Sequence, residues 1–256
     1  MSDPASADPS PAGESHADHP LGPRAIAELG LIEGWRALRA NALPGLILWG
    51  VAVAVVAGYY LVDPVTDALD RLGAVKDHHG FAYSAVSTAL FAGVIPWVVT
   101  RLRSGPHGQG RLIAGLFIVL FWAEKGLEVD LFYRFQSWLF GHGTSVGTIV
   151  GKVLFDMLVY MPIWAVPSTI AGYRMERYNW HLGRWWRSLT GRWVAYEVLP
   201  IIIANWAVWV PAIVGIYLLP SPLQLPMQNL VLCLWALMLL FMTDPKNEPR
   251  EIEEPA

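Results

Sequence analysis

The sequence predicts an all-α fold, a polytopic transmembrane helical bundle with about six membrane segments (four to six) and a basic, Trp-rich interfacial segment. Of its 256 residues, 54% are hydrophobic and only 15% are charged, which is too apolar a balance for a soluble domain. The hydrophobic residues gather in stretches of about 20, and at about 1.5 Å per residue such a helix crosses roughly 30 Å of hydrocarbon. The main partner of the chain is therefore the lipid bilayer.

Composition divides the chain into four parts. Residues 1–24 are rich in Pro, Ser, Ala, Gly and Asp, which predicts a disordered tail, and they lack the features of a signal or transit peptide. Residues 25–110 hold an amphipathic lead-in and the first two spans. Residues 111–243 form the main membrane core, and 244–256 form an acidic C-terminal tail.

The first two spans, predicted over 44–62 and 81–100, each carry small residues four positions apart. The stripes are Gly50, Ala54 and Gly58 in the first span and Ala85, Ala89 and Gly93 in the second. Small residues let helix backbones approach closely in membranes. We expect these faces to pack helices and to permit a homo-oligomer.

The remaining spans follow the same hydrophobic pattern with more interruptions. The third begins at Leu112 and meets charged residues after Trp122; the fourth covers 148–173, the fifth 195–219 and the sixth 224–243. Prolines between the last two predict a turn, and Pro96 predicts a kink at the end of the second span. The basic segment over 174–193 places tryptophans and arginines where lipid headgroups would lie.

Lysine and arginine predict the orientation of the chain. They collect in the lead-in, in 101–111 and in 174–192, whereas the intervening loops carry few basic residues or none. Under the positive-inside rule these three segments and both termini are cytoplasmic. A preference for Arg over Lys indicates a bacterial inner membrane, with an organellar membrane as the alternative. A four-span arrangement requires a peripheral first span and a re-entrant last pair.

Six ionisable residues fall within or beside the third and fourth spans: Glu124, Lys125, Glu128, Asp130, Lys152 and Asp156. Each buried charge costs about 2.5 to 3.5 kcal/mol on insertion scales, so it needs a partner or a function. Helix rise places Glu128 about 24 Å into the third span, level with Lys152, and Glu124 or Lys125 level with Asp156.

Two interpretations of this cluster stay open. It lines a hydrophilic cavity, or it consists of neutralising pairs, among them Lys152 with Asp156 at i, i+4, that let two helices pack. Four carboxylates against two lysines leave an excess of acid, so we expect some of the acid to meet water.

The sequence holds no H-E-x-x-H motif, no C-x-x-C and no phosphate-binding glycine loop. His78 and His79 follow Asp77 without a suitably spaced third metal ligand, and Cys233 lies in an apolar run. We expect no enzyme, no catalytic residue, no cofactor, no metal and no nucleic-acid partner.

Four patches between 111 and 241 resemble a family of integral membrane proteins, the one named for the Mpv-seventeen protein and the twenty-two-kilodalton peroxisomal membrane protein. The resembling positions are Gly126, Phe132 and Tyr133 (G-P-x-x-H-x-W-Y), Lys152, Asp156 and Pro162 (K-x-x-x-D-Q-x-x-x-x-P), Asn205, Trp206 and Trp209 (N-W-x-x-W), and Pro220, Asn229 and Trp235 (V-P…R…N…W). The departures are Leu127, Asp130, Met157, Val210, Leu219 and Gln224. The resemblance implies an all-helical membrane protein, described for some members as channel-forming, with no established enzymatic reaction.

These observations favour a channel-like or transport-related protein whose solute is unknown, with a non-transporting membrane scaffold as the alternative. Asn205 lies about 15 Å deep in the fifth span, so we expect its amide to face protein. Asn229 of the sixth span is the preferred neighbour, and a backbone carbonyl one turn back is the local alternative.

Overall fold

The computed structural model describes residues 42–104, 112–190 and 193–242, together with isolated helical positions between 28 and 39. Within these residues every regular element is a helix and none is a strand, which confirms the all-α prediction. The predicted tails, 1–24 and 244–256, lie outside the described residues, and so does most of the lead-in.

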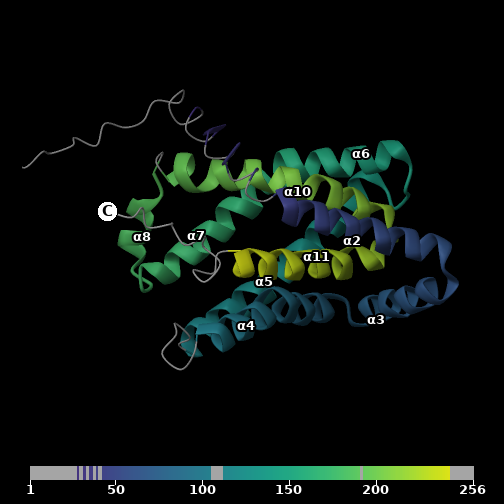
Figure 1. Cartoon of the computed structure of the whole chain (residues 1–256), viewed down its shortest axis with the longest axis horizontal. Helices are drawn as coiled ribbons and strands as arrows, with labels where there is room; N and C mark the ends of the chain where they lie inside the picture. The colour runs from purple at the N-terminus through teal and green to yellow at the C-terminus, as the bar shows by residue number, and fades with distance from the viewer. Residues whose placement is uncertain are drawn as a thin grey trace, which may run out of the picture.

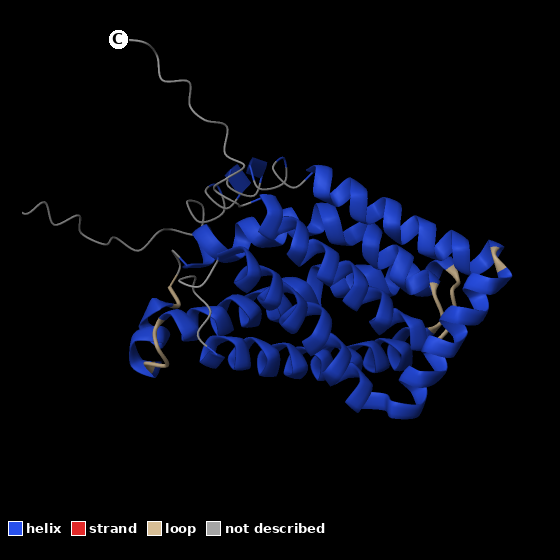
Figure 2. Cartoon of the chain, turned by 60° about the horizontal axis from the view of Figure 1, so that its bottom comes forward, coloured by secondary structure: helices blue, strands red, loops and turns tan. Residues whose placement is uncertain are grey.

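The helices lie side by side along one axis and form a bundle (Figures 1 and 2). In chain order they are α2 (Ala42–Leu61), α3 (Asp63–Thr88), η1 (Ala89–Val94), α4 (Ile95–Ser104), α5 (Leu112–Phe140), α6 (Val146–Phe155), η2 (Asp156–Ala165), α7 (Val166–Arg177), α8 (Leu182–Ser188), η3 (Val194–Val198), α10 (Leu199–Leu218) and α11 (Ser221–Met242), where η marks a π-helical segment. The α2–α3 and α5–α6 connections lie at one end of the bundle, and α8 lies at the other end with the last turn of α4 (Figure 1). We call the second of these the basic end.

Two helical stretches in the described part of the chain are long and apolar enough to cross a membrane, Asp63–Leu102 and Val146–Arg177. A third candidate is the bent pair Leu199–Trp206 and Val208–Leu218, whose halves meet at 53°. The apolar helix Gly45–Leu61 is shorter. Membrane-crossing helices are therefore compatible with the structure.

The segment between the first two predicted spans, 63–80, is helical, whereas it was predicted to be a loop. Asp63 and Pro64 occupy the first turn of α3, where an acidic residue and a proline both favour helix initiation. The helical geometry breaks at Gly80, whose φ of 52° is accessible to glycine at little cost. The predicted start of the second span, at Phe81, coincides with this break.

Prolines accompany all three π-helical segments. Pro96 and Pro200 each follow a segment, η1 and η3, by two residues, while η2 contains Pro162 and ends just before Pro167. A proline ring clashes with the carbonyl four residues back and offers no N–H, and a wide turn accommodates both defects. At η1 the N–H of Ile95 accordingly bonds to the carbonyl of Leu90, five residues back. The kink expected from Pro96 takes this form.

Glycines set the close approach of α5 to α3 and η1. A Cβ on Gly126 would lie 2.3 Å from the carbonyl oxygen of Ser84, and one on Gly93 would lie 3.4 Å from that of Ile118. By contrast, a Cβ on Gly50 would meet nothing within 4 Å. The small-residue stripe of the second span thus packs within the chain, whereas Gly50 in the first span faces outward.

Candidate functional site

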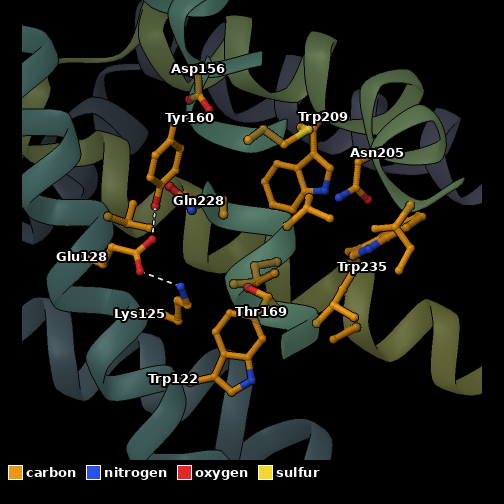
Figure 3. Close-up of a pocket in the computed structure, with 18 of the residues that line it drawn as sticks. Trp122, Lys125, Glu128, Asp156, Tyr160, Thr169, Asn205, Trp209, Gln228 and Trp235 are labelled. Carbon is orange, nitrogen blue, oxygen red and sulfur yellow. Dashed lines mark hydrogen bonds and ion pairs between the residues drawn. The ribbon is translucent and has the colours of Figure 1, made fainter. Parts of the chain in front are cut away.

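A cavity of about 720 Å³ lies inside the bundle, between α5, η2, α7, α10 and α11 (Figure 3). Polar and aromatic side chains from these five elements face it. The labelled residues are Trp122, Lys125, Glu128, Asp156, Tyr160, Thr169, Asn205, Trp209, Gln228 and Trp235.

Next to Asp156, at what we call the inner end of the cavity, three buried side chains pack together, and we call them the plug: Gln136, Lys152 and Tyr217. They are 0%, 1% and 1% exposed. Gln136 Nε2 donates to the carbonyl oxygen of Lys152 at 3.2 Å, and Lys152 Nζ lies 5.7 Å from the ring centre of Tyr217. The Tyr217 hydroxyl donates to Asp156 Oδ2 at 2.6 Å. Asp156 is therefore the last lining residue before the chain packs solidly.

One wall of the cavity carries an ion pair. Lys125 Nζ donates to Glu128 Oε2 at 2.5 Å and to Ser168 Oγ at 2.7 Å. The hydroxyl of Tyr160 donates to the other carboxylate oxygen of Glu128 at 2.5 Å. Because both oxygens of Glu128 and the ammonium of Lys125 have partners, this group is internally neutral.

The opposite wall comes from α10 and α11 and is aromatic. Trp209 and Trp235 face the cavity from these two helices, and Asn205 lies one turn before Trp209 (Figure 3). The 53° bend of α10 falls between Trp206 and Val208, four residues before Pro211. A proline disrupts the helix at that spacing, so Pro211 accounts for the bend that sets this wall.

Asn205 was expected to face protein, but it lines the cavity and makes no hydrogen bond to any described residue (Figure 3). The expected partner, Asn229, is bonded elsewhere. Its Nδ2 donates to Ser87 Oγ at 2.9 Å, and its Oδ1 accepts from Thr88 Oγ1 at 2.9 Å. The expected hydrogen bond between α10 and α11 is thus absent, and an amide is left facing open space.

The other end of the cavity reaches the basic end of the bundle. Arg177, in the last turn of α7, belongs to the lining and is exposed. Glu197 also belongs to the lining and forms an ion pair with Arg174. The cavity therefore extends from Asp156, next to the plug, to exposed residues beside the basic, Trp-rich segment.

Asp130 belongs to a separate, closed cluster and does not line the cavity. Its carboxylate accepts from Lys76 Nζ at 2.8 Å, from Ser84 Oγ at 2.6 Å and from Arg134 Nε at 3.1 Å. The sequence interpretation missed Lys76 because it assigned that residue to a solvated loop. Asp63 and Pro64, which favour the start of a helix, were the signal that Lys76 belongs to a helix able to pack against α5.

Glu124 also lies away from the cavity. It is exposed on the outer face of α5, between the exposed apolar side chains of Leu120 and Leu127. Of the six predicted cluster residues, the structure brings together three at the cavity: Lys125, Glu128 and Asp156.

The predicted register between the third and fourth spans is wrong. Glu128 lies opposite Tyr160 and Lys152 opposite Gln136, rather than Glu128 opposite Lys152. The depth estimate assumed a core of roughly 30 Å, whereas α5 continues to Phe140 before the chain turns tightly into α6. Lys152 accordingly has no carboxylate within ion-pair distance among the described residues, and the expected pair with Asp156 does not form.

Six of the twelve positions singled out by the family resemblance line the cavity: Tyr133, Asp156, Asn205, Trp209, Asn229 and Trp235. The others lie in helix contacts. The ring of Phe132 stacks on that of Tyr160 with centres 3.8 Å apart, and Trp206 Nε1 donates to the carbonyl of Met157 at 2.9 Å. Pro162 lies in η2, and Pro220 immediately precedes α11.

Among the described residues, no three His, Cys, Asp or Glu side chains are placed to hold a metal ion. The chain matches no protein-family model, no curated protein sequence and no solved structure. The family resemblance therefore stays a prediction that depends on the four motif patches.

Proposed function

We propose that the protein is a multi-pass membrane protein with about six spans, and that its cavity is the solute-binding chamber of a channel-like or transport-related protein. The proposed spans are α2, α3 with η1 and α4, α5, α6 with η2 and α7, η3 with α10, and α11. Both termini and the basic end would face the cytoplasm, as the distribution of arginines predicts.

The shape and lining of the cavity carry this proposal. Polar side chains inside an apolar bundle are costly unless they serve water or a solute. Here Asn205 faces open space without a partner, and the space runs from the exposed Arg177 to Asp156 before it meets the plug. A chamber open at one end and closed at the other favours a transporter facing the cytoplasm over an open pore.

Solute flux in liposomes tests the proposal. Protein reconstituted into liposomes should accelerate the entry of at least one solute from a panel of small cations, anions and neutral polyols, followed by light scattering after an osmotic step. Trp209→Leu and Asp156→Asn should reduce the flux, since both side chains face the chamber (Figure 3). Glu124→Gln is the matched control, because that carboxylate lies on the outer face.

The outer face of α5 favours the scaffold alternative. Glu124 is exposed between Leu120 and Leu127, and a carboxylate facing lipid near mid-span would be stabilised by a donor from another helix. Under this alternative, liposomes with folded protein would show no flux above protein-free liposomes, and Glu124→Gln would disrupt association with a partner helix.

A further inference from the structure

We infer that the chamber binds an amphipathic organic cation, an inference that depends on the proposed function and specifies its substrate class. A bulky ammonium or phosphonium compound with apolar substituents meets the three features of the lining: aromatic faces, an acidic inner end and an unpartnered amide.

Aromatic rings line the chamber on several sides. Trp122, Trp209 and Trp235 face the space from three different helices, and Tyr160 adds a further ring (Figure 3). Tyr133 also belongs to the lining. The faces of such rings carry partial negative charge and attract cations, most strongly in tryptophan and in sites without bulk water. The three tryptophans from three helices therefore favour a cation with apolar surface over a small hydrated ion.

Of the three carboxylates that line the chamber, only Asp156 forms no ion pair with a described residue. Glu128 is neutralised by Lys125 at 2.5 Å, and Glu197 is neutralised by Arg174. Asp156 is held by the Tyr217 hydroxyl at 2.6 Å and has no cation within ion-pair distance among the described residues.

Neither of the two remaining cations forms an ion pair with Asp156. Lys152 lies in the plug, where its ammonium faces the ring of Tyr217 at 5.7 Å, and it is not part of the lining. Arg177 stands exposed at the mouth, where water and salt screen it. A cation that enters past the mouth would therefore meet the Asp156 carboxyl group, which accepts from Tyr217 and has no ion-pair partner among the described residues.

Asn205 provides a polar contact on the aromatic wall. Its amide faces the chamber beside Trp209 and makes no hydrogen bond to a described residue (Figure 3). Its carbonyl oxygen can accept from an ammonium N–H or face the positive end of a quaternary centre. Together with Asp156 it places acceptors at two positions along a chamber of about 720 Å³, which is roomy enough for a drug-sized ligand.

Two hydrophobic ions of nearly the same shape and opposite charge test the inference. Tetraphenylphosphonium and tetraphenylborate are titrated into the purified full-length protein in nanodiscs, and binding is followed by quenching of tryptophan fluorescence, with empty nanodiscs as the blank. We expect saturable binding of the phosphonium, weakened about tenfold in Asp156→Asn and in Trp209→Leu. Glu124→Gln should bind it like the wild type.

Equal or tighter binding of tetraphenylborate would overturn the inference, as would unchanged phosphonium binding in both folded chamber variants. If Asp156→Asn does not fold, Asn205→Leu and Trp209→Leu decide the result. The binding experiment needs no flux, so the two proposals fail separately. Cation binding without any solute flux refutes transport alone, and flux of neutral or anionic solutes without cation binding refutes the cation chamber alone.

Discussion

Asp130 and Asp156 illustrate two ways in which a buried carboxylate is held in this bundle. Asp130 accepts from Lys76, Ser84 and Arg134, so its charge is compensated where it lies. Asp156 accepts from Tyr217 and otherwise faces the chamber. The first arrangement stabilises the fold, and the second leaves a group available to a ligand.

Lys76 should matter far more for stability than Arg134, although both donate to Asp130. The side chain of Lys76 is 7% exposed and that of Arg134 is 50% exposed. Lys76→Met strands a buried carboxylate and should cost about 3 to 5 kcal/mol, whereas Arg134→Met should cost about 0 to 1 kcal/mol. Thermal unfolding in detergent measures both.

Adding Asp130→Asn to Lys76→Met should restore most of the lost stability. Equal melting temperatures of the two single variants would contradict the claim that Lys76 is the main partner of Asp130.

Tyr217→Phe should destabilise the protein more than Tyr60→Phe. Tyr217 donates to the buried Asp156 at 2.6 Å, while Tyr60 is exposed and donates to the carbonyl of Leu218 at 2.6 Å. Losing a bond to a charged acceptor costs about 1.5 to 3 kcal/mol, and losing an exposed neutral one costs about 1 kcal/mol or less. Chemical unfolding followed by circular dichroism would detect the difference. The reverse order of stability would show that Asp156 does not depend on Tyr217.

At the scale of the elements, hydropathy predicted where the apolar helices run, but it did not predict how they are broken. The start of the fourth and fifth spans, near 148 and 195, lies within two residues of Val146 and Val194. Whether a proline produces a π-helical turn or a bend depends on how its clash with the preceding turn is relieved, and this in turn depends on the packing of the neighbouring helices. The prolines marked the sites, and only the structure shows that Pro96 has a π turn before it while Pro211 bends α10.

Gly126→Ala should disrupt the contact of α5 with α3. The added Cβ would lie 2.3 Å from the carbonyl oxygen of Ser84, a backbone atom that cannot move without shifting the helix. Overpacking of this kind costs about 1 to 3 kcal/mol or more, so the melting temperature should fall clearly. Gly50→Ala is the matched control, since nothing lies within 4 Å and alanine favours a helix. A loss of stability at Gly50 equal to that at Gly126 would instead indicate that Gly50 packs against another copy.

At the scale of the whole molecule, the sequence predicted a polar site between the third and fourth spans and identified part of it. Lys125, Glu128 and Asp156 do line the chamber. The contribution of α10 and α11 was not predicted as lining, because Asn205 was expected to face protein with Asn229 as its neighbour. An asparagine that packs between helices and one that lines a cavity look the same in the sequence. Only the structure shows that the bent α10 places Asn205 at the cavity.

The orientation of the bundle is testable with single cysteines in a Cys233→Ser background. Ser145, in the α5–α6 connection, and Arg184, in α8, lie at opposite ends of the bundle. With cytoplasmic termini, Ser145→Cys should react with an impermeant maleimide in intact cells, and Arg184→Cys should react only after lysis. Labelling of Arg184→Cys from outside would reverse the topology.

The reaction of cysteines along the chamber tests the central claim most directly. In proteoliposomes of known orientation, Thr169→Cys and Asn205→Cys should react with a charged methanethiosulfonate applied at the basic end, because both positions line the chamber (Figure 3). Gln136→Cys, in the plug, and Leu120→Cys, on the outer face, should stay unmodified from either side. An unreactive Asn205→Cys in folded protein, or one modified only from the opposite end, would contradict a water-filled chamber that opens at the basic end.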